Sequence, residues 1–572
     1  MMFKAETMSI QKGIKQFGEI GKDSARHEID NLLGNECFGE IDFATITQEM
    51  KDQALPMLMF MIMKRNGNLK SRAVANGSYQ RVYTDKEDCT SPTPDFYAFK
   101  YIVAVIVKEG RDCATVDLPG FFLQTEQDKD KTILLKLTGS IAMLLIETDP
   151  KWRKYLIEEN GKKVIYVVCS KAIYGTMNAA LLAYKKLAKL FLEWGFVMNP
   201  YDPCVWNIMV GRDQMTIMFH IDDLLMSHKK AEVVTRYIKL LTEQYGKRDP
   251  LTVTRGLVHE YLGMTFDLRT KGEVALSQYD YIKKMHTRLP EAMKGKNRST
   301  PAPADLFKQK DNDTELDSDR QQIYHTITAE TLWLSQRSRP DTQLATGYHC
   351  TRVKNPTEND WTKLIWEQQY IWATRFIPLI IAITEKGAII YIDGAHATHT
   401  DSKGHSGLYA TLGKGAMINV SKKVSLNTLS STETEVVSTG ERLPKCIWFR
   451  YFRIWQGDEP VEDVLMQDNK SAMILQRNWP FSTRKGSQHI NIKYFFATDK
   501  IKSKEIKMVH CPTERMIADY NSKPLQGKLF YDNRNMIMGI NTDHFERYKD
   551  RYAEVLKAYD LFEGEDDLYK LV

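Results

Sequence analysis

The sequence feature that most restricts the fold is a pair of adjacent acidic residues inside a strongly apolar stretch. Asp222 and Asp223 separate the run 216–221 (TIMFHI) from the run 224–226 (LLM). Two strand-like runs with a short polar break predict a β-hairpin that carries the acids at its tip. The alternative is that two aspartates are simply good turn residues. Buried carboxylates without a partner are costly, so a functional pair would need a compensating ligand.

A third carboxylate stands in the same setting. Asp117 follows the strand-like run 113–116 (CATV). Converging carboxylates repel one another unless a cation neutralises them, and Mg²⁺ accepts carboxylates together with substrate phosphates. Two such ions can activate the attacking oxygen and stabilise the leaving oxygen in phosphoryl transfer. We therefore interpret Asp117, Asp222 and Asp223 as a candidate metal site.

The C-terminal half repeats this pattern of acids at the ends of apolar runs. Asp393 ends the run 388–392, Asp468 follows the run 464–467, and Asp519 follows a shorter apolar run. Taken singly, each of these acids is a weak signal, and a purely structural role is the simpler explanation.

A fourth acid of this set comes from a predicted helix start. The segment 430–435 (SSTETE) predicts a helix that Ser430 caps, with Glu433 closing a capping box. Glu433 therefore has a structural explanation. Glu435 has none, which makes it the better candidate ligand.

Composition excludes several other classes of protein. A hydrophobic fraction of 43% with 27% charged residues is ordinary for a globular protein and excludes a mostly disordered chain. The net charge of +6 is too small to indicate nucleic-acid binding by itself. The 8 cysteines occur singly, which predicts a reducing compartment rather than a disulfide framework or a zinc knuckle. The apolar stretch 54–63 is shorter than the roughly 20 residues of a membrane helix, so we expect neither a membrane span nor secretion.

The chain is predicted to contain several domains. Short strands, predicted at 113–116, 164–169 and 216–221, alternate with helices from about 55 to about 235. The apolar spacing in 179–195 predicts an amphipathic helix that ends at Gly195. Prolines and charges at 296–320 predict a linker. A second α/β segment begins near 386 and fades near 530.

Several short motifs stand in the order found in one family. They are 70–77 (KSRAVANG), 116–124 (VDLPGFFLQ), 171–175 (KAIYG), 202–205 (DPCV), 220–223 (HIDD), 261–264 (YLGM) and 339–341 (RPD). With these motifs the chain resembles the C-terminal part of the Pol polyprotein of copia-type LTR retrotransposons, in which a reverse transcriptase precedes a ribonuclease H. Their order favours the metal interpretation of both acid sets.

Further motifs resemble the family's ribonuclease H. They are 430–435 (SSTETE), 468–472 (DNKSA), 488–492 (QHINI) and 518–525 (ADYNSKPL). The chain departs from the family pattern in a few places: His220 replaces a tyrosine, Met177, Asn178 and Ala180 replace Lys, Gln and Pro, and Ala395 replaces an aspartate.

The resemblance implies an α+β right-hand polymerase with fingers, palm and thumb, a connection region, and then an α/β RNase H-like domain. The implied division is a helical lead-in at 1–50, fingers and palm at 51–235, thumb at 236–300, a connection region with the linker at 301–385, an RNase H-like domain at 386–530 and a tail at 531–572.

The resemblance also implies the roles of individual residues. Two Mg²⁺ ions per site, with Mn²⁺ as a substitute, are expected on Asp117, Asp222 and Asp223 in the polymerase and on Asp393, Glu435, Asp468 and Asp519 in the nuclease. Nucleotide binding is expected at Lys70, Arg72, Phe122 and Tyr174. Phe122 would exclude a ribose 2′-OH, unless it is only a core residue. His489 would assist the nuclease, unless it is a structural histidine. The basic strip at 477–507 would follow a phosphate backbone.

The implied function is RNA-directed and DNA-directed DNA synthesis with cleavage of RNA–DNA hybrids. The expected partners are an RNA template, a DNA primer, the hybrid, dNTPs and other retrotransposon Pol and capsid products. The expected location is the cytoplasm, within virus-like particles, or the nucleus. The alternative is a catalytically decayed fragment that only binds nucleic acid, which the degenerate segment after Gly175 suggests. All seven expected carboxylates are present, which favours an active enzyme.

Overall fold

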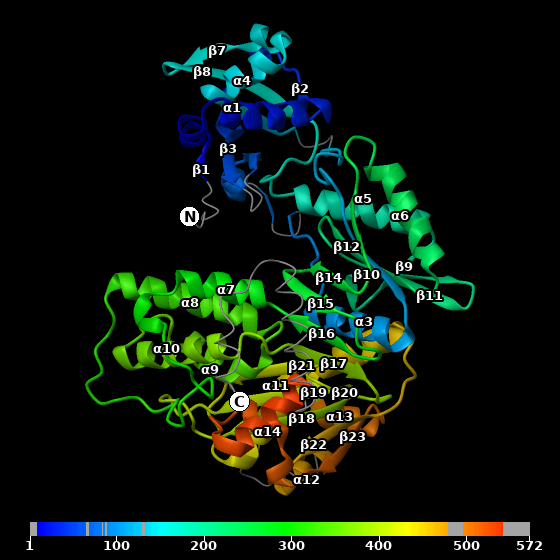
Figure 1. Cartoon of the computed structure of the whole chain (residues 1–572), viewed down its shortest axis with the longest axis vertical. Coiled ribbons are helices and arrows are strands. Elements are labelled where there is room, and N and C mark those ends of the chain that lie inside the picture. The colour runs from blue at the N-terminus through cyan, green and yellow to red at the C-terminus, as the bar shows by residue number, and fades with distance from the viewer. Residues whose placement is uncertain are drawn as a thin grey trace.

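The computed structural model describes residues 8–63, 68–82, 84–85, 89–128, 132–478 and 496–540. Its strands form four sheets, which succeed one another from the top of Figure 1 to the bottom. Mixed α/β layers in the first part and a separate α/β domain at the C-terminal end confirm the predicted fold class.

The N-terminal part of the chain, which we call the fingers after the predicted domain, contains a seven-stranded sheet with helices packed against it. Its strands are β1 (Met8–Ser9), β2 (Phe38–Gly39), β3 (Leu55–Met63), β4 (Leu69–Ala75), β6 (Leu134–Thr138), β7 (Ile157–Glu159) and β8 (Lys162–Cys169). The accompanying helices are α1 (Ile10–Gly34), α2 (Gln48–Gln53) and α4 (Ser140–Thr148). Because β1 pairs with β3 and β2 with β8, the segment predicted as a separate lead-in belongs to this sheet.

The part of the chain that we call the palm, after the predicted domain, contains a six-stranded sheet of order β13-β5-β12-β11-β10-β9. Its strands are β5 (Asp112–Asp117), β9 (Val197–Asn199), β10 (Asp202–Val210), β11 (Asp213–His220), β12 (Asp223–His228) and β13 (Thr252–Arg255). Phe219 and Leu224 pack with α5 (Ala179–Glu193) and α6 (Ala231–Tyr245) on one face. Met218 and Leu225 pack with α3 (Phe96–Glu109) on the other. Burial on both faces explains the continuously apolar runs, and the predicted hairpin and amphipathic helix are confirmed.

A five-stranded sheet of order β14-β15-β16-β17-β20 joins the palm to the C-terminal part. Its strands are β14 (Val258–Tyr261), β15 (Met264–Asp267), β16 (Val274–Ser277), β17 (Leu379–Ile383) and β20 (Gly413–Lys414). Four helices lie between β16 and β17: α7 (Tyr279–Arg288), α8 (Ser318–Ser335), α9 (Gln343–Arg352) and α10 (Glu358–Ala373). We call these four helices the helical unit, which lies at the left of Figure 1. The ranges predicted for the thumb and connection do not coincide with it, because the thumb range begins inside α6 and contains four strands.

The segment predicted as a linker is packed. Ala302, Leu306 and Leu316 are 3%, 0% and 4% exposed, and Leu306 lies in a cluster with Tyr348 of α9. Prolines and charges therefore mark an irregular segment here, whereas its apolar residues attach it to the helical unit.

The C-terminal domain has a five-stranded sheet of order β21-β19-β18-β22-β23. Its strands are β18 (Ile389–Ala395), β19 (His405–Thr411), β21 (Ile418–Lys423), β22 (Asp463–Gln467) and β23 (Ile506–His510), and its helices are α11 (Ser431–Trp455), α12 (Lys470–Asn478), α13 (Phe496–Lys502) and α14 (Gly527–Met538). β18 is antiparallel to β19 and parallel to β22. Helix α14 crosses the boundary predicted at 530, with Ile537 and Met538 fully buried.

Helix α3 of the palm also contacts the C-terminal domain. Lys100 Nζ donates a hydrogen bond to the carbonyl oxygen of Ala416 (2.9 Å), and Tyr101 Oη donates to Asp458 (2.7 Å). The two parts are therefore docked through buried polar contacts.

Among the helices of the described ranges, none has the length and apolar character needed to cross a membrane.

Candidate active sites

The three acids predicted in the polymerase part meet at one end of the palm sheet. Asp117 ends β5, Asp223 begins β12, and the two residues are opposite each other in this antiparallel pair of strands. Asp222 lies in the hairpin turn, and its carbonyl oxygen accepts a hydrogen bond from Leu118 N (3.0 Å). Carboxylate oxygens of all three acids lie within 4.8 Å of one another. The structure thus brings together residues that the sequence placed only at the ends of strands.

The tip of this hairpin has a strained backbone. Ile221 has a φ of 59°, in the left-handed region that β-branched residues rarely adopt. Such strain persists where the surrounding structure dictates it, and it is concentrated at functional sites. The paired strands β11 and β12 hold the turn on both sides, so the backbone sets the positions of the carboxylates in advance.

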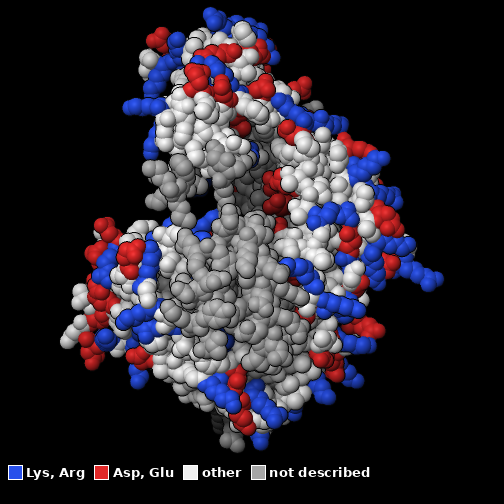
Figure 2. All heavy atoms as spheres, in the orientation of Figure 1, with Lys and Arg blue, Asp and Glu red and all other residues white. Residues whose placement is uncertain are grey.

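Burial and mutual repulsion both act on these carboxylates. Burial, followed by the charges of Asp222 and Asp117, raises the pKa of Asp223 to about 6. Burial also raises the pKa of Asp222, and the charge of Asp117 adds to this effect. A divalent cation would relieve the repulsion, so this donor set fits one. Figure 2 shows a hollow in the surface between the fingers and the palm, with acidic side chains visible inside it.

Three of the expected nucleotide-binding residues form a row of contacts. The Arg72 guanidinium on β4 lies 5.1 Å from the centre of the Tyr174 ring, and this ring lies edge-on to Phe122 at 5.0 Å. Lys70 is two residues before Arg72 on the same strand, so both side chains share one face. Half-buried Phe122 also packs at the margin of the palm core.

The row lies beside the palm acids. Burial is the main cause of the raised pKa of Tyr174, and the charges of Asp222 and Asp117 also contribute to it. Ala75 N donates to the carbonyl oxygen of Tyr174 (2.8 Å). Gly175 has a φ of 92°, and a Cβ atom there would overlap the carbonyl oxygen of Ala75. This close approach requires glycine and fixes Tyr174 against the fingers.

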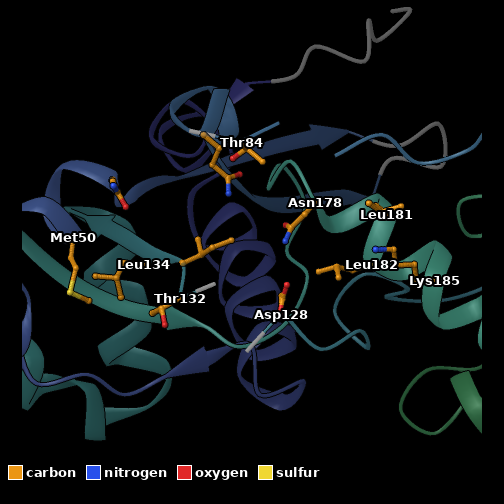
Figure 3. Close-up of a pocket in the computed structure, with 12 residues that line it drawn as sticks. Met50, Thr84, Asp128, Thr132, Leu134, Asn178, Leu181, Leu182 and Lys185 are labelled. Carbon is orange, nitrogen blue, oxygen red and sulfur yellow. The ribbon is translucent and has the colours of Figure 1, made fainter. Parts of the chain in front are cut away.

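Two glutamines that the sequence did not single out hold the segment after Gly175. Gln80 Oε1 accepts a hydrogen bond from Met177 N (2.8 Å), and Gln127 Nε2 donates to Asn178 Oδ1 (3.4 Å). Asn178 also lines a cavity of about 380 Å³ between the fingers and α5, together with Lys185 (Figure 3). Neither glutamine belongs to a motif or a periodic pattern, so the sequence carries no signal for this role.

A second carboxylate cluster lies in the C-terminal domain. Oxygens of Asp393 on β18, Glu435 on α11 and Asp468 after β22 lie within 4.8 Å of one another. β18 and β22 are parallel neighbours, so their C-terminal ends meet at one edge of the sheet. Glu435 accepts hydrogen bonds from Gly394 N (3.2 Å) and Gln467 Nε2 (3.3 Å). Burial, followed by the charges of Asp393 and Asp468, raises the pKa of Glu435 far above its ordinary range.

Asp519 lies next to this cluster and is paired with a lysine. It belongs to a short 3₁₀ helix (Ile517–Asn521), where Lys523 Nζ approaches its carboxylate to 2.8 Å and that of Asp393 to 3.5 Å. Burial, followed by the charge of Asp393, raises the pKa of Asp519. Lys523 was not among the expected site residues, although its spacing of four from Asp519 is a usable signal for an ion pair.

Glu433 is used at the start of α11 and takes no part in the described acid cluster. Ser430 Oγ accepts a hydrogen bond from Glu433 N (3.2 Å), as the predicted cap requires. The Glu433 carboxylate accepts from Leu429 N (2.8 Å), one residue before the cap. Glu433 therefore stabilises the start of the helix, as predicted. The backbone N–H that its carboxylate binds is that of Leu429, one residue before the Ser430 N–H of a standard capping box.

The structure describes His220 and only part of the predicted basic strip at 477–507. Burial lowers the pKa of His220, which ends β11 beside the acid pair. His489 and the middle of the basic strip, 479–495, lie outside the described residues. Within the described ends of that strip, Arg477 donates to the carbonyl oxygen of Met508 (2.7 Å), and Lys500 pairs with Glu505 (3.0 Å).

Comparison with known proteins places these sites in context. Residues 54–301 match the family described as "Reverse transcriptase (RNA-dependent DNA polymerase)". The chain is similar to the retrovirus-related Pol polyprotein from transposon RE2 of Arabidopsis thaliana, with 23% identity over 477 residues, which are 82% of this chain and 30% of the relative. It is also similar to the Transposon Ty1-JR2 Gag-Pol polyprotein of Saccharomyces cerevisiae, with 19% identity over 543 residues, 92% of this chain and 29% of the relative.

The chain thus spans about 30% of the length of the curated relatives it matches. Among solved structures, it is similar to a foamy viral protease-reverse transcriptase in complex with double-stranded DNA. The TM-score is 0.47 and the identity is 11%, with coverage of 86% of this chain and 70% of that chain.

Proposed function

The chain belongs to the copia-type retrotransposon Pol reverse transcriptases, and we propose that it is an RNA- and DNA-directed DNA polymerase that also cleaves the RNA strand of RNA–DNA hybrids. One observation carries this proposal: two separate groups of three carboxylates converge, one on the palm sheet and one on the C-terminal sheet. A single metal-dependent nuclease would need only one such group.

The chemistry at each centre follows from its donor set. Asp117, Asp222 and Asp223 would hold the polymerase ions, and Asp393, Glu435 and Asp468, with Asp519 beside them, would hold those of the nuclease. Pairs of Mg²⁺ ions, or Mn²⁺ in their place, would activate the attacking oxygen and stabilise the leaving oxygen. The strained turn at Ile221 and the bonds from Gly394 and Gln467 orient the carboxylates for this task.

The row of contacts beside the palm acids would bind the incoming dNTP. Arg72 and Lys70 would neutralise the charge of the triphosphate oxygens. Arg72 would form bidentate hydrogen bonds, which its planar guanidinium favours. Tyr174 supports Arg72 through its ring face. Phe122, which packs against the same ring, would lie below the sugar.

The proposed partners are an RNA template, a DNA primer, their hybrid and dNTPs, with other Pol and capsid products in a virus-like particle. The proposed location is the cytoplasm, within such particles, or the nucleus. Backbone and shape contacts, rather than base contacts, would hold such a hybrid.

Primer extension on a homopolymer RNA template tests the polymerase half. We expect the chain to extend oligo(dT) on poly(rA) in the presence of Mg²⁺ and dTTP. The nuclease half is tested in the same preparation by release of label from the RNA strand of a hybrid. If the chain binds the hybrid but neither extends nor cleaves, the decayed nucleic-acid-binding fragment is the correct interpretation.

Phe122→Val is expected to relax the choice of sugar. Removing the ring opens space where a ribose 2′-OH would lie, so incorporation of ribonucleotides relative to dNTPs should rise about 10- to 200-fold, the range that one misfitting group is worth in a pocket. The measurement is competitive incorporation of UTP against dTTP.

Phe121→Leu is the matched control for this prediction. Phe121 is fully buried in the palm core next to Phe122, so its substitution disturbs packing without opening the same space. Unchanged discrimination in a folded Phe122→Val chain would leave Phe122 as a core residue only.

Two glutamates near the start of α11, Glu435 and Glu433, are expected to differ sharply in the effect of their substitution. Glu435→Gln removes a charged ligand and should lower hybrid cleavage by roughly 100-fold or more. Glu433→Gln should retain cleavage within about threefold, because a glutamine oxygen still accepts the hydrogen bond at the helix start. The measurement is the single-turnover cleavage rate of each variant. A greater loss in Glu433→Gln would exchange the ligand and capping roles.

A further inference from the structure

The motif Arg339-Pro340-Asp341, which lies between α8 and α9, forms a buried turn in the helical unit. Arg339 and Asp341 are 1% and 0% exposed. The Arg339 guanidinium donates a bidentate pair of hydrogen bonds to the Asp341 carboxylate, at 2.8 and 2.7 Å. Arg339 also donates to the carbonyl and hydroxyl oxygens of Thr374, and Tyr370 Oη donates to Asp341 (2.7 Å). Every strong polar group of the turn is therefore fixed in one geometry.

This turn is hydrogen-bonded to the segment that carries Asp519. Tyr520 Oη donates to the carbonyl oxygen of Asp341 (2.9 Å). Asn419 Nδ2 donates to the carbonyl oxygen of Pro340 (3.1 Å). Asn419 and Asn521 also exchange hydrogen bonds through both amides, at 3.0 and 2.7 Å. Both asparagines are almost completely buried.

The same segment reaches the carboxylates from its other side. Ser522 Oγ donates to Asp393, and Lys523 Nζ pairs with Asp519 (2.8 Å). On β19, directly opposite Asp393, a Cβ atom on Gly407 would overlap the carbonyl oxygen of Ala518. Glycine thus lets the segment lie flat on the sheet, and a continuous chain of buried contacts runs from the turn to the acid cluster.

We propose that the Arg339-Pro340-Asp341 turn, acting through Tyr520 and Asn419, is a positioning element for Asp393 and Asp519 of the nuclease centre. The inference deepens the proposed nuclease function and rests on it. A buried ion pair is a poor source of net stability, because desolvation offsets much of its attraction. Its value here is geometric: outer contacts that orient metal ligands are worth about 10- to 100-fold in metal affinity or activity.

The most direct test removes one link and leaves the turn intact. Asp341 itself is unsuitable, because its loss would leave Arg339 buried without a partner. Tyr520→Phe deletes only the hydroxyl that bonds to the turn. The matched control is Tyr409→Phe: Tyr409 is 1% exposed, packs in the same apolar cluster and donates to the carbonyl oxygen of Met536 (3.3 Å).

The readout is Mn²⁺ affinity, measured by titration calorimetry on the full chain. A background with Asp117→Asn and Asp222→Asn removes the palm site, so that only the C-terminal site binds. We expect Tyr520→Phe to weaken Mn²⁺ binding about 10-fold and Tyr409→Phe to leave it unchanged, while both lower the thermal midpoint to a similar extent.

Two outcomes would overturn the inference in different ways. Equal Mn²⁺ affinity in Tyr520→Phe and its parent would show that the turn contributes only to folding. No Mn²⁺ binding in the parent background would instead contradict the proposed nuclease centre, and the inference would fail with it. Hybrid cleavage at limiting Mg²⁺, in the chain with an intact palm site, should fall in Tyr520→Phe with primer extension unchanged.

Discussion

Asp222→Asn is expected to lower primer extension on an RNA template by roughly 1000-fold, since a loss of about 4 kcal/mol of metal-borne stabilisation corresponds to that factor. Asparagine has nearly the same shape and still tolerates the turn, but it supplies no charge to a cation. Asp222 shares its cluster with Asp117 and Asp223 within 4.8 Å, so the charge of the whole donor set falls. The measurement is the rate of dTTP incorporation on poly(rA)–oligo(dT).

Binding and cleavage should survive this change. Affinity for a hybrid depends on Lys and Arg contacts to phosphate rather than on the acid cluster. Asp213→Asn is the matched control, because Asp213 begins β11, the strand that leads to the turn with Asp222, and forms an ion pair only with Lys229 among the contacts described (3.1 Å). Full extension by Asp222→Asn would contradict the assignment of the palm cluster.

The palm site could be predicted because its signals are local. The runs around Asp222 and Asp223 specify two neighbouring strands, and a hairpin fixes their register with few possibilities. The position of Asp117 across from Asp223 then follows from pairing of the sheet. The motif order supplied the rest, since it identified which of many acids belong together.

Contacts between distant segments could not be predicted in this way. Tyr520 and Asp341 are 179 residues apart, and nothing in either motif specifies a bond between a hydroxyl and a backbone oxygen. Strands β1 and β2 have two residues each, too few for a periodic pattern, so the predicted lead-in did not reveal its place in the fingers sheet. The segment 296–320 was wrongly predicted to be a linker for a different reason. Its composition is mostly polar, but three apolar residues in it are buried.

The separation of the two acid clusters leads to the second large effect. They lie on different sheets and share no residue, although α3 docks the palm on the C-terminal domain. Docking through buried contacts holds the two centres in one body, whereas metal ligation is a property of each donor set alone. Loss of one centre should therefore leave the chemistry of the other intact.

Asp468→Asn should accordingly lower cleavage of the RNA strand roughly 1000-fold by the same loss of about 4 kcal/mol and spare primer extension. Asp468 follows β22, and its second oxygen is held by Thr513 Oγ1 (3.1 Å), a bond that an asparagine oxygen can still accept. The measurement is hybrid cleavage and primer extension in one preparation, beside Asp222→Asn.

Asp499→Asn is the control for this variant, since Asp499 is an exposed acid on α13 whose described ion pair is a long one, 3.8 Å, with Lys500. Opposite losses in Asp468→Asn and Asp222→Asn can arise only from two independent centres, because a folding defect would lower both activities together. If Asp468→Asn cleaves the hybrid like its parent, the C-terminal cluster is not a nuclease centre, and the polymerase assignment would stand without it.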